Sequence, residues 1–207
     1  MPAPESAAAP VVNVTGGRLA LGPLRGDLLP TYHRWNNDFS MSRTLRSSQP
    51  WTTAQVAARL DALDADEHSV NFTIYRRADW RPLGNVALID VDWRARTAEL
   101  LLFIGEADCR GRGYGTEATR LILDYAFTAL GLHSVWLRVY AFNLAGQRAY
   151  EKAGFRVIGR RRECQLMGGK LWDVIYMDCL ASEFASSFLH TIFAPDKSRA
   201  GDTPTTA

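Results

Sequence analysis

A chain of 207 residues typically folds as one domain, and 47% apolar with 22% charged residues excludes a fully disordered chain, a collagen and a coiled coil. The longest purely apolar run, residues 100–104, is far shorter than the roughly 20 residues that a membrane-spanning helix needs. The formal net charge of +2 gives no indication of a nucleic-acid partner, and three scattered cysteines predict neither a disulfide framework nor a zinc site. We therefore expect a globular domain in the reducing cytoplasm that binds no metal, no nucleic acid and no membrane.

The two ends of the chain differ in composition from its middle. Residues 1–10 contain three prolines and no segment typical of a signal peptide, and residues 195–207 lack apolar periodicity. We therefore expect disordered tails at 1–16 and 191–207 on either side of a single domain at 17–190.

Arginine supplies 21 of the 24 basic residues. A GC-rich coding sequence explains such a bias without any function, whereas the guanidinium group also suits the oxygens of a phosphorylated ligand. The composition alone leaves both interpretations open.

The first part of the chain predicts one strand and two helices. An alternating segment at 18–24 is typical of a strand, and apolar residues at helical spacing predict a helix that Asp27 caps. Thr52 or Thr53 is expected to cap a second helix. The polar residues between the helices, 36–51, are predicted to form a long loop, and such loops often carry function.

The rest of the chain is rich in predicted strands. Alternating or continuous apolar runs predict six strands, and two amphipathic segments that each end at a glycine predict helices. The strands are expected at 70–75, 83–93, 97–104, 134–140, 155–158 and 172–180, and the helices at 116–130 and 143–153. This order predicts a mixed α/β domain in which an antiparallel meander precedes a βαβ-like half.

A glycine-rich turn follows the strand at 97–104 and opens the next helix. It reads Arg-Gly-Arg-Gly-Tyr-Gly-Thr over residues 110–116. Glycines let the backbone turn sharply, so that several N–H groups point to one spot, and the helix N-terminus adds partial positive charge. Arg110 and Arg112 add full charges. The turn is therefore predicted to bind a pyrophosphate or a similar anion, and it matches neither the dinucleotide fingerprint nor a Walker motif.

A second cluster starts at Asn143, after the strand at 134–140, and continues to Phe155. Asn143 suits the cap of the following helix. Tyr150 lies about two helical turns later, on the same side of that helix. Taken alone, Asn143 is explained as a cap and Tyr150 as a core residue.

Together the two clusters resemble the GNAT superfamily of acyl-CoA-dependent N-acyltransferases. Its phosphate-binding motif, Q/R-x-x-G-x-G/A, is matched by Arg110, Gly113 and Gly115. Its N-x-x-A…Y-E-K-x-G-F pattern is matched from Asn143 to Phe155. The chain looks most like the branch of ribosomal-protein N-terminal and spermidine acetyltransferases, and the resemblance covers residues 17–181.

The resemblance implies a mixed, mostly antiparallel twisted sheet that is split between its fourth and fifth strands, with flanking helices and with acetyl-CoA as cosubstrate in the gap. Backbone groups of Leu102, Phe103 and Ile104 would bind the pantetheine arm, and Asn143 would add a hydrogen bond. Arg148 could lie near the phosphates. The pyrophosphate would be held by the backbone amides of Arg110, Gly111, Arg112, Gly113, Tyr114, Gly115 and Thr116.

The resemblance also implies two catalytic residues. Tyr150 lies where the family places the general acid, and a phenol with a pKa of about 10 is a suitable proton source for a thiolate whose thiol has a pKa of about 8.5. Glu99 stands on the strand that leads to the anion-binding turn, where related enzymes often keep a glutamate, and it is the candidate base. Glu99 can equally be a surface carboxylate at a strand end.

The acceptor is expected to be a primary amine that attacks acetyl-CoA directly in a ternary complex. The 36–51 loop carries one acid, Asp38, against Arg43 and Arg46, which disfavours a polyamine and suits a peptide N-terminus or a small-molecule amine. Two alternatives stay open: a catalytically idle module that binds acyl-CoA, and an antibiotic or secondary-metabolite acyltransferase that uses another acyl-CoA. The protein is expected to be a monomer or a homodimer.

Overall fold

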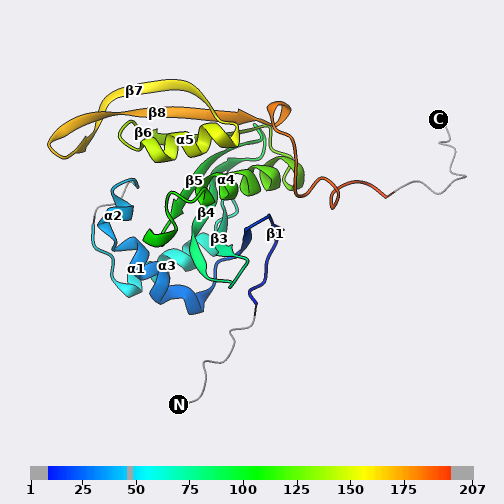
Figure 1. Cartoon of the computed structure of the whole chain (residues 1–207), viewed down its shortest axis with the longest axis horizontal. Helices are drawn as coiled ribbons and strands as arrows, with labels where there is room; N and C mark the ends of the chain where they lie inside the picture. Colours follow the sequence, from blue (N-terminus) through cyan, green and yellow to red (C-terminus); the bar gives the residue numbers. More distant parts are fainter. Residues whose placement is uncertain (1–8, 46–48, 197–207) are drawn as a thin grey trace, which may run out of the picture.

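The computed structural model describes residues 9–45 and 49–196, which build an eight-stranded sheet with helices on both faces (Figure 1). The strand order is β1-β2-β3-β4-β5-β6-β8-β7, and every neighbouring pair is antiparallel except β5 and β6. The strands are β1 (Val14–Thr15), β2 (Leu19–Pro23), β3 (Val70–Arg76), β4 (Pro82–Asp92), β5 (Thr97–Ile104), β6 (Ser134–Tyr140), β7 (Arg156–Met167) and β8 (Lys170–Leu180). The predicted mixed, mostly antiparallel α/β sheet is confirmed.

The helices form a layer on each side of the sheet. In the described residues they are α1 (Leu29–Asn36), α2 (Phe39–Ser42), α3 (Thr53–Asp64), α4 (Tyr114–Asp124) and α5 (Leu144–Ala153). Successive side chains of a strand point to opposite faces. Phe72 and Leu100 accordingly join the core beneath α4, whereas Thr73 and Phe103 contact α1 on the other face. None of the helices described is long and apolar enough to cross a membrane.

The sheet splits between β5 and β6. Their parallel pairing covers only three residue pairs, from Thr97 with Ser134 to Glu99 with Trp136. Beyond these residues the strands part, because β5 continues beside β4 and β6 continues beside β8. The predicted split between the strands at 97–104 and 134–140 is therefore confirmed, and it opens the sheet at the C-terminal ends of its two parallel strands.

The predicted N-terminal tail at 1–16 is too long. Val14 and Thr15 form β1, which pairs with β2, and Val14 is buried. A strand of two residues is too short for its alternation to be detected in the sequence. Residues 1–8 and 197–207, the outer parts of the two predicted tails, lie outside the described residues, and residues 191–196 contain neither helix nor strand.

The last two strands are longer than predicted and form a hairpin that reaches beyond α5 (Figure 1). β7 continues to Met167 rather than ending at residue 158. Arg160, Arg161 and Arg162 therefore lie within the strand. β7 is the edge of the sheet and most of its side chains are exposed, so no apolar alternation marks it in the sequence.

Local side-chain chemistry sets the helix boundaries. Thr52 caps α3 and forms a capping box with Gln55, which decides between the two predicted caps. Asp27 does not cap the first helix, because residues 26–28 form a 3-10 turn and α1 begins after it, at Leu29. α4 begins at Tyr114, earlier than predicted, and residues 125–129 extend it as a π-helical turn.

The buried carboxylate of Asp124 on α4 binds the segment after β8 through hydrogen bonds. Asp124 has no exposed surface and accepts hydrogen bonds from the Ser186 hydroxyl (2.6 Å) and from the backbone N–H groups of residues 187, 188 and 189 (3.0, 2.7 and 3.2 Å). Burial raises the pKa of Asp124, but the hydrogen bonds to its charged form outweigh burial and hold the pKa below its usual range. The carboxylate therefore stabilises the fold in its ionised form.

Replacing Asp124 with Ala is expected to lower the free energy of unfolding by about 3 kcal/mol, because several buried donors lose their acceptor. The pKa of Asp124 is lower in the folded protein than in the unfolded chain. Its contribution to the free energy of unfolding is therefore complete above the unfolded pKa of about 3.9, and it is lost as the pH falls through the folded pKa. Urea unfolding at pH 7 and pH 3 measures it, and the difference between wild type and variant should shrink at pH 3. Asp64→Ala, at an exposed position, is the control. An equal difference at both pH values would contradict the assignment.

Candidate active site

A cavity of about 530 Å³ opens where β5 ends and the chain turns into α4. The end of β5, the β5–α4 turn, the α2 region and α5 all contribute to its walls. The predicted site residues that line it are Leu102, Phe103, Ile104, Arg110, Gly111, Gly113, Gly115, Thr116, Asn143, Arg148 and Tyr150. Glu99, Arg112 and Tyr114 lie outside its lining.

The β5–α4 turn has backbone geometry suited to an anion. Gly111 and Gly113 have φ values of +74° and +82°, a region that favours glycine. Gly113 is also the N-cap of α4, and no side chain in the described residues caps this helix. The first N–H groups of α4 and its partial positive charge are therefore available at the edge of the cavity.

The Arg110 guanidinium is largely used within the protein. It donates hydrogen bonds to the carbonyl oxygens of Ile104 and Gly105, both at 3.0 Å. It also donates to the Ser40 hydroxyl (3.0 Å) and pairs with Asp38 (3.2 Å). Arg110 therefore ties the end of β5 to α2 along the edge of the cavity.

The remaining residues predicted to bind phosphate are Arg112 and Tyr114, within the turn, and Arg148 on α5. Arg112 is exposed, and its carbonyl accepts a hydrogen bond from Arg18 (3.1 Å). The Arg18 guanidinium also lies over the ring of Tyr114, 4.9 Å from its centre. Arg148 lines the cavity from α5, is exposed and donates to the carbonyl of Leu144 (3.2 Å).

Two residues of the α5 region face the cavity with different chemistry. Asn143 caps the helix, because its Oδ1 accepts from the Gly146 N–H at 3.0 Å, and its Nδ2 amide remains as a donor. Tyr150 is 9% exposed and packs edge-on against Phe155. Burial raises the pKa of Tyr150 to about 12. Its phenol is therefore protonated near neutral pH and can act there only as a proton donor.

Glu99 points to the opposite face of β5 from Leu102, the first cavity residue of that strand. It is 1% exposed, and the Arg138 guanidinium donates to it from Nε (2.7 Å) and from Nη2. Arg138 follows Trp136, the last residue of β6 that pairs with β5, so the ion pair bridges the two strands where they part. Glu99 is thus not an exposed surface carboxylate, and its role as a base stays a prediction.

The contribution of the α2 region to the cavity is not predicted by the sequence. Ser40, Met41 and Thr44 line the cavity, but they fall within the predicted loop at 36–51. A helix of four residues has no periodicity to detect. The available signal was Asp38, which caps α2 by accepting from the Ser40 N–H (2.9 Å).

A buried carboxylate positions α1 beside this region. Glu106 accepts hydrogen bonds from Trp35 (2.8 Å), Arg34 (2.5 Å) and Arg81 (2.5 Å). Burial raises the pKa of Glu106, but these donors outweigh burial and hold the pKa below its usual range. Gly105 is required beside it, because a Cβ at this position would lie 2.5 Å from the Trp35 indole.

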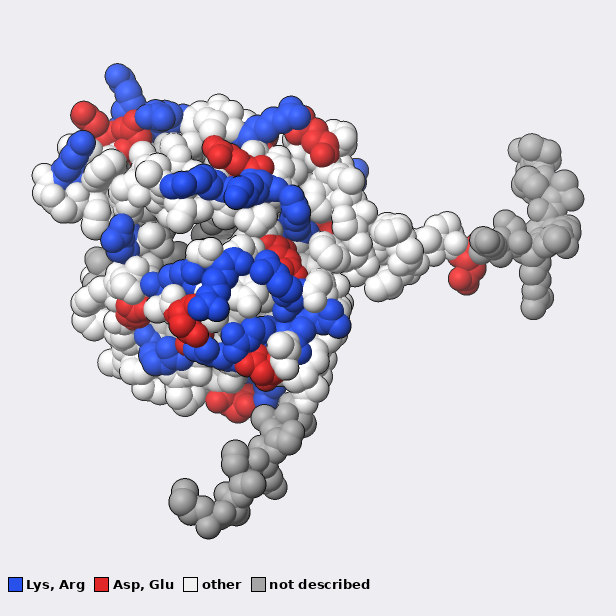
Figure 2. Space-filling view, in the orientation of Figure 1, with Lys and Arg blue, Asp and Glu red and all other residues white. Residues whose placement is uncertain are grey.

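The arginine excess is partly explained by ion pairs. Figure 2 shows basic and acidic side chains interspersed over one face of the molecule. Of the two arginines that argued against a polyamine, Arg43 is exposed and Arg46 lies outside the described residues. The pairs around the turn and the end of α1 join Arg18 with Glu117, Arg34 with Glu106, Arg81 with Asp108, and Arg110 with Asp38.

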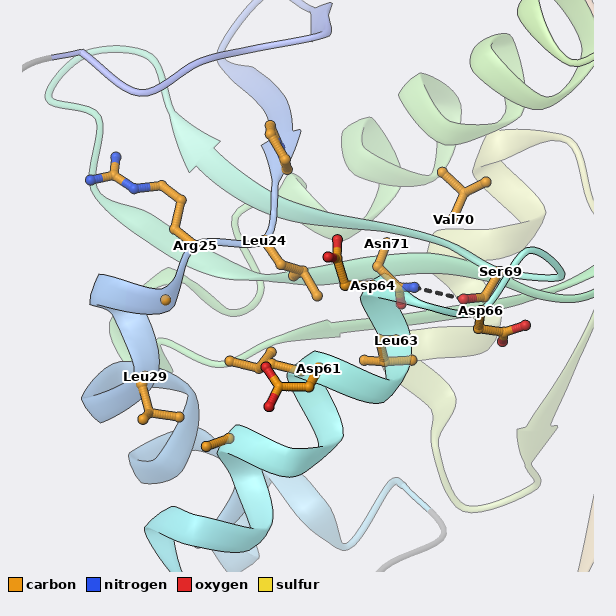
Figure 3. Close-up of a pocket in the computed structure, with 14 residues that line it drawn as sticks. Leu24, Arg25, Leu29, Asp61, Leu63, Asp64, Asp66, Ser69, Val70 and Asn71 are labelled. Carbon is orange, nitrogen blue, oxygen red and sulfur yellow. Dashed lines mark hydrogen bonds between the residues drawn. The ribbon is translucent and has the colours of Figure 1, made fainter.

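A second cavity, of about 490 Å³, lies between α3 and the ends of β2 and β3 (Figure 3). Its lining combines leucine side chains, among them Leu24 and Leu63, with the exposed carboxylates Asp61 and Asp64 of α3. None of the predicted site residues lines it. Within the described residues, no group of three or more His, Cys, Asp or Glu side chains could hold a metal ion.

Comparison with protein families agrees with this geometry. The model of the acetyltransferase (GNAT) domain matches residues 18–156, which include the split, the β5–α4 turn and α5. The chain therefore belongs to the GNAT acetyltransferase family, and it is an N-acetyltransferase that uses acetyl-CoA as its cosubstrate.

Three relatives illustrate the range of this similarity. The probable N-acetyltransferase YjcK of Bacillus subtilis (strain 168) is 37% identical over 114 residues, 55% of this chain and 61% of that protein. The alpha/beta-tubulin-N-acetyltransferase 9 of Homo sapiens is 28% identical over 155 residues, 69% of this chain and 74% of that protein. The crystal structure of spermidine N-acetyltransferase from Vibrio cholerae in complex with CoA and spermine has a TM-score of 0.74 and 26% identity over 80% of this chain and 97% of that one.

Gly115 offers a direct test of what fills the first cavity. A Cβ at this position would lie 3.9 Å from Ala149 and 4.0 Å from Leu102, which are ordinary contacts, so the fold itself accepts a side chain here. We expect Gly115→Val to leave the free energy of unfolding nearly unchanged and to weaken acetyl-CoA binding about tenfold or more, because the added methyl groups occupy ligand space.

Calorimetric titration with acetyl-CoA measures the binding, and urea unfolding measures stability. Gly115→Ala is the matched control and should bind more tightly than Gly115→Val. Wild-type affinity in Gly115→Val would mean that acetyl-CoA binds elsewhere.

Proposed function

We propose that this enzyme acetylates the primary amine of a small molecule or of a peptide N-terminus, by direct attack of the amine on acetyl-CoA in a ternary complex. The observation that carries this proposal is the first cavity, where an open helix N-terminus, an unpaired strand end and the buried phenol of Tyr150 meet.

The cavity residues fit the parts of acetyl-CoA, which supplies the acetyl thioester. Among the described residues, β5 has no partner strand on the β6 side beyond Glu99, so backbone groups of Leu102–Ile104 can bind the pantetheine arm. The turn from Arg110 to Thr116 would hold the pyrophosphate through its N–H groups. Asn143 Nδ2 would donate to the pantetheine, and Arg148 would add charge near the phosphates.

Tyr150 would act as the general acid. When the acceptor nitrogen has attacked the thioester carbonyl, the carbon–sulfur bond breaks and the sulfur needs a proton. The Tyr150 Oη would donate it, since burial keeps the phenol protonated at neutral pH. The transfer leaves CoA as a free thiol, whose pKa is about 8.5, and Tyr150 as a phenolate, which would regain its proton from water in a later step.

Glu99 would act as the base, directly or through a water molecule. An acceptor ammonium has to lose a proton before its nitrogen can attack. The Arg138 guanidinium donates to both carboxylate oxygens, so it would hold the Glu99 carboxylate in one orientation at the split.

The acceptor is expected to differ from a polyamine. The solved Vibrio cholerae enzyme holds spermine, and the human relative is named for tubulin, so the family accepts unlike amines. In this chain the described lining of the first cavity contains no carboxylate, and Asp38 and Glu106 are already paired, Asp38 with Arg110 and Glu106 with arginines of α1 and the β3–β4 turn. We further propose that the protein works in the cytoplasm, as a monomer or a homodimer.

Tyr150→Phe is expected to lower kcat about 100-fold with little change in acetyl-CoA affinity, because the ring stays and only the proton donor is lost. Release of free CoA measures kcat, and calorimetry measures affinity. In the wild type, the rate should rise as the acceptor amine loses its proton and should not fall through ionisation of Tyr150 until the pH approaches about 12. Full activity in Tyr150→Phe would refute the general-acid role.

The same assay separates the enzyme from an idle acyl-CoA-binding module. A module would bind acetyl-CoA without releasing CoA from any amine, peptide acceptors included. The acyl chain is tested in parallel by comparing acetyl-CoA with longer acyl-CoA substrates.

Glu99→Gln is expected to lower kcat about tenfold at pH 7 and to lose less as the pH approaches the pKa of the acceptor amine, because a neutral amine needs no base. The pH profile of kcat measures this recovery. A deficit that stays constant with pH would assign Glu99 a purely structural role beside Arg138.

A further inference from the structure

The first cavity has walls from two separately packed parts of the molecule. α5 contributes Tyr150 to its lining, and the α2 region contributes Ser40, Met41 and Thr44. Tyr150 belongs to the core beneath α4, whereas Met41 belongs to the apolar cluster of Trp35 on the α1 face of the sheet. The width of the cavity therefore depends on where α2 stands relative to α5.

α2 adjoins the segment of β5 that is expected to bind the pantetheine arm. Phe103 packs against the same apolar cluster as Met41, and Trp35 meets the Phe103 ring edge-on with ring centres 6.0 Å apart. Leu102 and Ile104, on either side of Phe103, line the same cavity as the α2 residues. An arm that is bound along this segment would therefore have α2 beside it.

Arg110 connects α2 with the end of β5 through most of its hydrogen-bonding capacity. Its guanidinium donates to the carbonyl oxygens of Ile104 and Gly105 on the β5 side, both at 3.0 Å. On the α2 side it donates to the Ser40 hydroxyl at 3.0 Å and to the Asp38 carboxylate at 3.2 Å. A guanidinium has five N–H groups, and these contacts use four of them. A bidentate phosphate contact needs two, so Arg110 could form one only by releasing α2 or β5.

Asp38 uses its two carboxylate oxygens for two different contacts. Oδ1 caps α2 by accepting from the Ser40 N–H at 2.9 Å, and Oδ2 accepts from Arg110. The hydrogen bonds from Ser40 and Arg110 outweigh burial and hold the pKa of Asp38 below its usual range, so the carboxylate is ionised at neutral pH. The Arg110 and Asp38 side chains are 32% and 34% exposed, and solvent therefore weakens their ion pair. We expect its loss to have a moderate effect.

We propose that Arg110 is a positioning residue rather than a phosphate ligand, and that together with Asp38 it holds α2 as the wall of the first cavity beside the pantetheine arm. This inference rests on the proposed function, because it concerns the same acetyl-CoA site. It adds a role for the Arg110 side chain and for α2. The backbone N–H groups of the β5–α4 turn remain the groups that would hold the pyrophosphate.

Asp38→Asn separates the two roles of Arg110 by the sign of its effect on acetyl-CoA binding. Asparagine keeps an Oδ1 that can cap α2 and removes only the charge that pairs with Arg110. If Arg110 positions α2, the affinity for acetyl-CoA should fall about threefold. A phosphate-binding Arg110 would instead be released from its partner, so an unchanged or higher affinity would overturn the inference. Calorimetric titration of the full-length protein measures the affinity.

Asp108→Asn is the matched control for the change in charge. Asp108 precedes the same turn and pairs with Arg81, but it neither contacts Arg110 nor lines the first cavity. This variant should bind acetyl-CoA as the wild type does. An equal loss of affinity in Asp108→Asn and Asp38→Asn would overturn the inference, because the effect would then not depend on α2.

A double-mutant cycle tests whether Arg110 and Asp38 act through one contact. Arg110→Met is expected to weaken acetyl-CoA binding about tenfold, since it also removes the donor to Ile104 and Gly105 at the end of β5. Adding Asp38→Asn to this variant should cause no further loss, whereas additive losses would overturn the inference. Urea unfolding checks that each variant is folded. Asp38→Asn leaves the β5 contacts in place, so it decides the question by itself if Arg110→Met does not fold.

Competition by adenosine diphosphate gives a readout that a general loss of structure would not reproduce. This nucleotide carries the pyrophosphate of CoA but no pantetheine arm. Its affinity, measured by displacement of acetyl-CoA, should be the same in wild type, Asp38→Asn and Arg110→Met. Equal losses for the nucleotide and for acetyl-CoA would overturn the inference and leave the proposed function intact. If the nucleotide does not displace acetyl-CoA from the wild type, the pyrophosphate site of the proposed function fails.

Discussion

The early end of pairing between β5 and β6 is the constraint on which the rest of the structure depends. Three residue pairs join these parallel strands, and beyond them the strands separate although each keeps its partner on the outer side. A sheet that stops pairing in its middle leaves backbone donors and acceptors without partners, which is unfavourable unless a ligand or water satisfies them. The Glu99–Arg138 ion pair holds the strands together at that point, and α4 and α5 start on either side of the opening.

The parts of the site that are local in sequence could be predicted from it. The glycines of the β5–α4 turn are visible in the sequence just before a helix, where they predict a sharp turn. The structure agrees, because two of them adopt positive φ, a region that favours glycine. Asn143 and Tyr150 have a fixed relation, since both belong to one helix and lie about two turns apart. The mixed sheet and its split followed from the resemblance to a known family, which rests on these same two clusters.

The parts that depend on distant contacts could not be predicted. Arg138 and Glu99 are 39 residues apart in sequence, and nothing in either strand indicates that one neutralises the other. The short helix α2 has too few residues for a periodic pattern, and the two-residue strand β1 has none.

The hairpin of β7 and β8 leaves a strand of 12 residues at the edge of the sheet, and an exposed edge is a template on which another chain can pair. Two β7 strands that met antiparallel about Arg161 would place Arg160 of each copy opposite Arg162 of the other. The repulsion of these like charges and the bulges that interrupt the register of β7 oppose such pairing. The exposed arginine triplet thus makes edge-to-edge pairing of β7 unfavourable in this register.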